Sequence, residues 1–293
     1  MGIADKITIV TVCDNHYTVM LAALIKSIEV NHKSCEPIDI YVVTDKVSNK
    51  NVSKLVSSVG SQLISLKWLK IEDIFPTDLK LPLDGSSFPL NVYARLFIPH
   101  FVPEEVERVL YLDVDMIVLK DISILWKTNL QNRMVAGVVD RAETVANIWA
   151  GITNYKELHI QPDTKYFNSG LLIIDTFKWR DFHIAERVIE CVNQNKKYAW
   201  FPDQYGLNVI LANQWYELDP KWNTYAVLFE KNPFIIHFIG RKPIYNTYSY
   251  NQLYEIEFYK YLKLTAWKNF KPLSENNRLF KKILNKLEKF LKK

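Results

Sequence analysis

The stretch YLDVDMIVL, residues 111–119, decides the fold that we expect for this chain. It continues an apolar run that begins at Val109, which is typical of a strand buried on both faces. Asp113 and Asp115 follow that run at the carboxyl end of the predicted strand, where parallel α/β sheets bind their ligands. On an extended backbone, residues i and i+2 point to the same side, about 6.6 Å apart along the strand.

Two carboxylates held close together in a sheltered place repel each other unless a cation or a proton lies between them. Their hard oxygen atoms suit Mg²⁺ or Mn²⁺, which complete their coordination with phosphate oxygens and water. An Asp-x-Asp sequence is also common in solvated loops and at helix caps. Taken alone, the pattern leaves both interpretations open.

On both sides of this stretch, short β-branched runs alternate with helical patterns. The alternation predicts an α/β fold in which helices cover a mostly parallel central sheet. We expect strands at residues 7–13, 37–44, 63–71, 134–139, 166–175 and 234–239, and helices at 14–31, 48–59, 91–101, 176–196 and 203–213.

The net charge of +5 belongs to the C-terminal segment. Residues 275–293 hold seven basic and two acidic residues, so the rest of the chain is balanced and no nucleic-acid surface is expected. Apolar residues recur there at helical spacing with lysines between them, which favours an amphipathic helix on an anionic membrane surface. A helix packed on the core or on a neighbouring subunit is the alternative. We divide the chain into a main domain, 1–268, and a basic helical extension, 269–293.

The three cysteines contain no CxxC pair, so we expect neither a disulfide framework nor a cysteine zinc site. The first residues, MGIADKITIV, lack the pattern of a signal peptide, and no apolar run approaches 18 residues. These features predict a cytoplasmic protein, held through its basic extension at the inner face of the cytoplasmic membrane.

Five further motifs lie in order around the aspartates: CDNHY (13–17), VYAR (92–95), YFNSGLLIID (166–175), FPDQYGLN (201–208) and IIHFIGRKP (235–243). Each is weak alone. Together they resemble the family 8 retaining glycosyltransferases, which include bacterial lipopolysaccharide α-galactosyl- and α-glucosyltransferases and, more distantly, glycogenin. The resemblance runs from about residue 7 to residue 243, and it implies a GT-A-type nucleotide-sugar-binding fold.

The resemblance implies a metal site and a donor site. Asp113, Asp115 and His237 match the metal ligands of the family, and the imidazole favours Mn²⁺ over Mg²⁺. Tyr17 can stack on the base and Asp14 can accept hydrogen bonds from the nucleoside, although local evidence alone favours a helix N-cap for Asp14. The positions that match donor-binding residues are Val12, Asp14, Tyr17, Asp113, Val114, Asp115, Asp140, Asn168, Gly240 and Lys242.

Several residues match positions near the reacting sugar. Gln204 corresponds to the residue on the face of the sugar opposite the leaving group. Asp203 and Asp140 resemble ligands of the sugar hydroxyls, and Asn168 can join them. Arg95 matches a position near the diphosphate, where its planar fork can bind phosphate or sugar oxygens. On local evidence a surface arginine on an amphipathic helix is the alternative for Arg95.

The chain departs from the family pattern at two places. The segment after Gly240 is one residue short and carries Ile244 where a tryptophan often stands, which leaves the reach of Lys242 open. His16 replaces a common asparagine. Neither departure touches the three metal ligands.

The function implied is transfer of galactose or glucose from its UDP-sugar, with retention at the anomeric carbon, to a lipopolysaccharide, lipooligosaccharide or another surface glycan. Retention allows a double displacement or a same-face route, and Gln204 carries an amide, which is a poor nucleophile. Three alternatives stay open: a self-glucosylating protein of the glycogenin kind, a nucleotidyl transferase, and a non-catalytic membrane-attached module that binds UDP-sugars.

Overall fold

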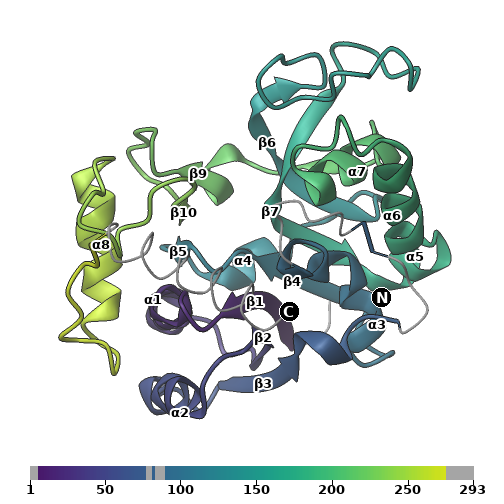
Figure 1. Cartoon of the computed structure of the whole chain (residues 1–293). Helices are drawn as coiled ribbons and strands as arrows, with labels where there is room; N and C mark the ends of the chain where they lie inside the picture. The colour runs from purple at the N-terminus through teal and green to yellow at the C-terminus, as the bar shows by residue number, and fades with distance from the viewer. Residues whose placement is uncertain (1–5, 77–80, 83–89, 275–293) are drawn as a thin grey trace, which may run out of the picture.

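The computed structural model describes residues 6–76, 81–82 and 90–274. A seven-stranded central sheet has the strand order β3-β2-β1-β4-β7-β6-β8, and a smaller sheet of order β5-β10-β9 lies beside it (Figure 1). No helix in these described ranges combines the length and the apolar character needed to cross a membrane. The predicted basic extension lies almost wholly outside them, since residues 275–293 are not described.

The first half of the central sheet is parallel, as the sequence predicts. β1 pairs with β2 on one side and with β4 on the other, and β2 pairs with β3. The carboxyl ends of these strands therefore meet at one edge, which places the ends of β1 and β4 side by side. The elements are β1 (Ile7–Asp14), α1 (Thr18–Asn31), β2 (Ile38–Asp45), α2 (Asn49–Ser58), β3 (Ile64–Lys70) and β4 (Arg108–Leu112).

The second half of the sheet turns antiparallel around β7 (Lys165–Asp175). β7 runs antiparallel to both β4 and β6 (Val135–Thr144), and the short β8 (Tyr216–Glu217) pairs in parallel with β6. Parallel pairings still outnumber antiparallel ones in the central sheet, so the expectation of an α/β fold with a mostly parallel sheet is confirmed. The antiparallel pairings are confined to the β4-β7-β6 part of the sheet.

The small sheet fixes the position of the chain after the aspartates. β5 (Met116–Val118) runs antiparallel to β10 (Ile235–His237), and β9 (Thr224–Tyr225) pairs in parallel with β10. The register sets His237 opposite Met116, the residue that follows Asp115. A strand-to-strand register therefore brings together side chains more than a hundred residues apart.

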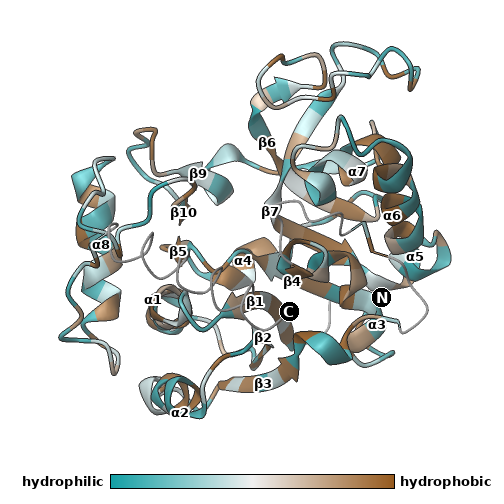
Figure 2. Ribbon diagram, in the orientation of Figure 1, coloured by the Kyte–Doolittle hydropathy of each residue, from teal (hydrophilic) through white to brown (hydrophobic). Residues whose placement is uncertain are grey.

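Two apolar clusters cover the two faces of the central sheet. Along β4, Leu110 and Leu112 face one cluster, and Val109 and Tyr111 face the other. This alternation explains the continuous apolar run in the sequence, because both faces of the strand are buried. Figure 2 shows the apolar residues concentrated along these central strands.

Two of the predicted helices differ from the expected ones. Residues 91–101 form two short 3₁₀ turns, η2 (Leu90–Val92) and η3 (Ala94–Phe97), and then the single turn of α3 (Ile98–Phe101). Pro99 lies inside that segment and restricts the residue before it, which disfavours one continuous helix. Residues 176–196 are divided because His183 adopts a left-handed backbone with φ 51°. The two pieces are α5 (Thr176–Asp181) and α6 (Ile184–Gln194).

Two further helices complete the main part of the chain. α7 (Pro202–Ile210) confirms the helix predicted near 203–213, and α8 (Gln252–Leu262) packs against α1 (Figure 1). The chain stays attached beyond residue 268, because the backbone N–H of Leu273 donates to the carbonyl of Ile244 at 2.8 Å. The short helix α4 (Ile122–Trp126) follows β5.

Candidate active site

Asp113, Val114 and Asp115 form a turn between the central and the small sheet. β4 ends at Leu112 and β5 begins at Met116, so the expectation of an extended backbone through both aspartates is wrong. The N–H of Asp113 donates to the carbonyl of Gly170 on β7 at 2.8 Å. The carbonyl of Asp115 accepts from the N–H of Phe238 at 2.9 Å, just after β10. Each aspartate is thus anchored to a different sheet, and the turn brings their carboxylates together.

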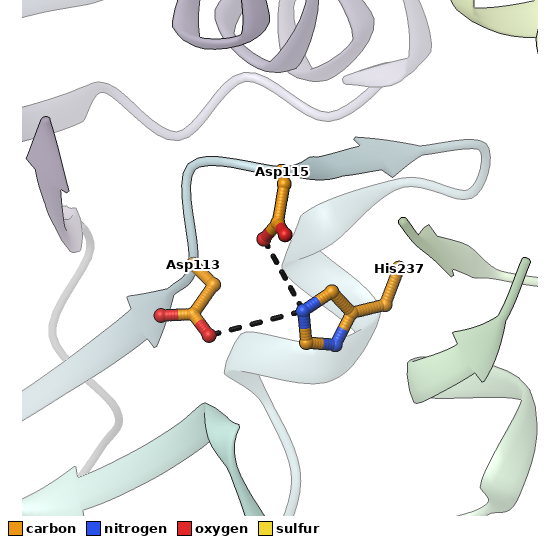
Figure 3. A group of neighbouring side chains, drawn as sticks. All are labelled: Asp113, Asp115 and His237. Carbon is orange, nitrogen blue, oxygen red and sulfur yellow. Dashed lines mark ion pairs between the residues drawn. The ribbon is translucent and has the colours of Figure 1, made fainter. Parts of the chain in front are cut away.

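The three predicted metal ligands form one cluster. One ligand atom each of Asp113, Asp115 and His237 lies within 4.8 Å of the others (Figure 3). His237 Nε2 is 3.2 Å from Asp115 Oδ1 and 3.8 Å from Asp113 Oδ2. Figure 3 shows both carboxylates and the imidazole pointing toward a common centre.

Gly170 leaves room for an ion at this centre. A Cβ on Gly170 would lie 2.6 Å from His237 Cε1 and 2.7 Å from Asp113 Oδ2, closer than real Cβ atoms approach their neighbours. The absence of a side chain therefore keeps the space beside the ligands open. Two carboxylates and one imidazole form a donor set that fits a divalent cation such as Mn²⁺ or Mg²⁺.

Lys242 reaches Asp115 despite the shortened segment before it. Its Nζ forms an ion pair with Asp115 Oδ2 and donates to the carbonyl of Phe238 at 2.6 Å. Burial raises the pKa of Asp115, but Lys242 and His237 outweigh it, so the pKa of that carboxyl lies below its ordinary value. Burial raises the pKa of Asp113 above its ordinary value, although Arg95 opposes the shift. The two aspartates are therefore electrostatically unequal.

A pocket of about 260 Å³ opens beside the aspartates. Its lining comes from the ends of β1 and β4, from the 3₁₀ turns and from the segment after β10. The pocket therefore lies at the sheet edge where the sequence predicts a ligand. Its lining includes Val12, Asp14, Tyr17, Arg95, Asp113, Val114, Asp115 and Lys242, all predicted, together with Asn91, Val92 and Tyr111.

Asp14 shapes the turn that ends β1. Its Oδ1 accepts hydrogen bonds from the N–H groups of His16 and Tyr17, each at 2.9 Å. The helix cap position is occupied by Tyr17, so Asp14 acts one turn earlier than a helix N-cap would. Its carboxylate lines the pocket at the same time.

Arg95 is buried between Asp113 of the candidate ligand cluster and Asp203. Its NH2 donates to Asp113 Oδ1 at 3.0 Å, and its NH1 donates to the carbonyl and the Oγ of Ser169 at 2.5 and 3.0 Å. Its Nε lies 3.2 Å from Asp203 Oδ2 without hydrogen-bond alignment. The surface-arginine alternative is excluded, since only 8% of Arg95 is exposed. The guanidinium therefore fixes the positions of the Asp113 and Asp203 carboxylates relative to each other.

The predicted sugar-site residues form a hydrogen-bonded cluster deeper in the fold. Asn168 Nδ2 donates to Asp140 Oδ2 at 3.0 Å and to Gln204 Oε1 at 3.1 Å. Ser169 Oγ donates to Asp203 Oδ2 at 3.0 Å. All four predicted residues, Asp140, Asn168, Asp203 and Gln204, are thus brought together by β6, β7 and the first turn of α7.

Gly240 lies between Phe238 and Lys242, with a left-handed φ of 74°. A side chain there would strain the backbone, and a Cβ would meet Tyr250 Oη at 2.9 Å. This bend allows the chain after β10 to turn Lys242 back toward Asp115.

Sequence reasoning missed several residues of the site. Tyr111 Oη donates to Asp113 Oδ1 at 2.6 Å, and Tyr225 Oη donates to Asp140 Oδ2 at 3.0 Å. Asn223 Oδ1 lies 2.8 Å from His237 Nδ1. Tyr111 had a local signal, because it stands two residues before Asp113 in the strand. Asn223 and Tyr225 had none, since long-range strand pairing places them.

The whole site falls within a region that matches a known family. The model of glycosyl transferase family 8 matches residues 8–243, from before Val12 to just after Lys242. The chain belongs to this family. It is therefore a glycosyltransferase, and the predicted family resemblance is confirmed.

Curated proteins match along most of the chain. General stress protein A of Bacillus subtilis (strain 168) is 29% identical over 281 residues, which cover 88% of this chain and 94% of that protein. The lipopolysaccharide 1,2-glucosyltransferase of Escherichia coli (strain K12) is 26% identical and covers 88% of this chain and 78% of its own length. Glycosyltransferase GlyB of Streptococcus pneumoniae is 29% identical, but the match spans only 57% of that longer protein.

Solved structures share the fold. The bifunctional glycosyltransferase WbbM aligns with a TM-score of 0.74 at 23% identity over 91% of this chain and 51% of its own. The galactosyltransferase LgtC, solved with donor and acceptor sugar analogs, aligns with a TM-score of 0.71 at 22% identity over 89% and 96%. The GT-A-type expectation is confirmed by these neighbours.

Proposed function

We propose that this enzyme is a metal-dependent, retaining glycosyltransferase that moves a hexose from UDP-galactose or UDP-glucose to a glycan. One observation carries the proposal: two aspartates of the Asp113, Asp115 and His237 cluster line the same pocket as Tyr17 and Lys242. A divalent cation, an aromatic ring and an ammonium group around one pocket suit a nucleoside diphosphate.

The cation site is best suited to Mn²⁺, because an imidazole joins the two carboxylates, and Mg²⁺ is the second candidate. When bound, the ion supplies positive charge next to the diphosphate. Lys242 supplies further positive charge from the protein, since its ammonium can exchange the contact with Asp115 for one with a phosphate oxygen.

The nucleoside is assigned to the β1 side of the pocket. Tyr17 offers a ring for the uracil, and Asp14 offers a carboxylate oxygen for hydrogen bonds from the base or ribose. Val12 and Val114 supply apolar lining. This arrangement leaves the sugar on the inner side, toward Arg95 and the buried cluster.

Retention requires the acceptor to attack from the face that the diphosphate leaves. A double displacement needs a protein nucleophile, and the amide of Gln204 is a poor one. Its Oε1 already accepts hydrogen bonds from Asn168 and from the N–H of Ser169. We therefore favour a same-face route in which the leaving phosphate takes the acceptor proton, while Gln204, Asp203 and Asp140 orient the sugar.

The acceptor we propose is a surface glycan, such as a lipopolysaccharide or lipooligosaccharide, and the name of the Escherichia coli relative supports this class. A glycan carried on lipid would place the enzyme at the inner face of the cytoplasmic membrane. The basic residues of 275–293 would then bind the anionic headgroups.

A screen without acceptor tests the donor assignment. The purified enzyme is incubated with Mn²⁺ and each of several nucleotide sugars, and release of free nucleotide is measured. UDP-galactose or UDP-glucose should be hydrolysed fastest, and Lys242→Met should be slower by about 10²-fold because a charge at the leaving group is lost. Hydrolysis of nucleoside triphosphates in preference to UDP-sugars would overturn the proposal. Intact-mass spectrometry in the same samples detects self-glycosylation.

A further inference from the structure

Resting on the proposed function, we propose that Asn223 is a positioning residue that turns His237 toward the metal and joins the metal site to the sugar site. Asn223 ends the 3₁₀ turn η4 (Pro220–Asn223), just before β9. It is 3% exposed, and His237 is 2% exposed. Neither side chain has water as a ready alternative partner.

The donor and the acceptor of each hydrogen bond in this region can be assigned, because some of the groups can only donate and others can only accept. The backbone N–H of Gly170 can only donate, and it points at Asn168 Oδ1 at 3.0 Å. The other end of Asn168 faces the Asp140 carboxylate at 3.0 Å, which accepts. Two independent contacts therefore fix the amide of Asn168 with its oxygen toward Gly170 and Asn223.

The orientation of Asn223 follows from that of Asn168. Asn168 Oδ1 needs a donor on its second side, so Asn223 presents its Nδ2 there, at 2.9 Å. Asn223 Oδ1 then faces His237 Nδ1 at 2.8 Å. An amide oxygen only accepts, so Nδ1 of His237 must carry the hydrogen. Nε2 is left as the nitrogen that faces Asp113 and Asp115 and can bind the cation.

The hydrogen bond between Asn223 and His237 orients a metal ligand, although Asn223 itself does not bind the metal. A metal-binding histidine whose second nitrogen is held by a hydrogen bond has a fixed tautomer and ring orientation, and loss of that partner typically costs about 10–100-fold in metal affinity. Turning the Asn223 amide over would set two donors face to face at His237. It would also set two acceptors face to face at Asn168. The contact with His237 is buried and the contact with Asn168 is partly buried, so each mismatch is costly.

The chain of hydrogen bonds continues beyond Asn168. Its Nδ2 also donates to Gln204 Oε1 at 3.1 Å, and Asp140 accepts a further bond from Tyr225 at 3.0 Å. Tyr225 lies on β9, directly opposite His237 in the strand register. A change in the orientation of Asn223 therefore reaches both His237 and the amide and carboxylate assigned to the donor sugar.

Direct metal binding tests the proposal without depending on turnover. Binding of Mn²⁺ to the full-length protein is measured by electron paramagnetic resonance of the free ion, with no donor present. Asn223→Ala should bind Mn²⁺ about 10–100-fold more weakly than the wild type. Asn223→Asp keeps an acceptor for Nδ1–H but cannot donate to Asn168. It should bind Mn²⁺ close to the wild-type level and still turn over donor slowly.

Asn154→Ala is the matched control. Asn154 is also 3% exposed, and its amide makes two hydrogen bonds of 2.9 Å, with Asn195 and Tyr205. It should leave Mn²⁺ binding unchanged even if both alanine variants melt at a lower temperature. Wild-type binding in Asn223→Ala would overturn the proposal, and so would an equal loss in Asn154→Ala.

The metal-binding test separates the positioning role of Asn223 from the proposed use of a UDP-sugar donor. If Mn²⁺ binding depends on Asn223 but no UDP-sugar is consumed, the positioning role stands and the proposed function fails. If UDP-sugars are consumed and Asn223→Ala binds Mn²⁺ normally, the proposed function stands and the positioning role fails.

Discussion

Gly170 occupies the place where a single added carbon would close the candidate metal site. Its Cβ would lie 2.6 Å from an imidazole carbon and 2.7 Å from a carboxylate oxygen, and both belong to ligands anchored by backbone pairing. The glycine is therefore required for space, while its backbone N–H and carbonyl hold Asn168 and Asp113.

Gly170→Ala should lower Mn²⁺ affinity by at least about 10-fold, because His237 or Asp113 must move aside. Mn²⁺ binding measured by calorimetry checks this. Gly137→Ala serves as the control in the same sheet, since the three atoms nearest its Cβ would be ring and Cβ atoms of Phe167, at 3.3 Å or more. Equal metal affinity in Gly170→Ala and the wild type would mean that the cation does not bind between these three side chains.

At the residue scale, the sequence predicted the three candidate ligands that the structure brings together, but it could not place the residues that contact them. Asp113 and Asp115 are visible because two carboxylates follow an apolar strand, and His237 stands at the end of another. Asn223 lies in an irregular segment before a strand of two residues, where neither periodicity nor a motif marks it. Its role depends on pairing between β9 and β10, which no local pattern specifies.

At the scale of elements, Asp121 ties the end of α1 to the start of α4. Its Oδ2 accepts from the N–H groups of Lys33 and Ser34 at 2.8 and 3.0 Å, and its Oδ1 accepts from the N–H of Ser123 at 2.9 Å. Burial raises the pKa of Asp121, but the backbone donors outweigh it, so the pKa lies well below its ordinary value. The helix α1 that this junction holds packs against β5 of the small sheet.

Asp121→Asn should lower the free energy of unfolding by about 1–3 kcal/mol at pH 7, because hydrogen bonds to a charged group are lost. The folded pKa is depressed, so the stabilisation is present above an unfolded pKa of about 3.9 and is lost as the pH falls through the folded value. Urea unfolding at pH 7 and pH 3 should therefore show a smaller difference from wild type at pH 3.

Asp39→Asn is the control for this comparison, because its partner Lys6 has a side chain that is 56% exposed. Exposed ion pairs contribute about 0–1 kcal/mol. A loss in Asp121→Asn that is no larger than the loss in Asp39→Asn, or that does not change with pH, would contradict the assigned role.

The elements that the sequence predicted well are those with strong local patterns. The strand at 7–13 and the helix ending at Asn31 match β1 and α1 closely, because their buried runs are long and uninterrupted. The single helix at 91–101 was wrong because Pro99 and tertiary packing favour 3₁₀ turns. Of the small sheet, the strand expected at 234–239 is confirmed as β10, but β9 and the pairing of the three strands were not predicted, since these strands have two or three residues and pair across long sequence separations.

At the scale of the whole molecule, the site lies at the carboxyl-end edge of the parallel strands. The alternation of strands and helices in the sequence predicts that edge. Its parallel half was predictable from short strand–helix units. The antiparallel β7 was not, because the long segment between β6 and β7 allows either direction. That direction matters for function, since it sets Gly170 opposite Asp113.

The basic segment 275–293 is predicted to attach the molecule to anionic membranes. The full-length enzyme should co-sediment with vesicles that contain phosphatidylglycerol but not with phosphatidylcholine vesicles, and binding should fall at high salt because charges are screened. A protein lacking 275–293 should stay in the supernatant. Equal sedimentation of the two proteins would exclude a membrane role for this segment.

The proposed function requires that a metal held by Asp113, Asp115 and His237 take part in transfer from a UDP-sugar. The most direct measurement follows UDP release after exhaustive chelation and then after addition of Mn²⁺, in the wild type and in Asp115→Asn. The expected result is that chelation abolishes release, that Mn²⁺ restores it in the wild type, and that Asp115→Asn is not restored. Full release by the metal-free wild type would contradict the claim.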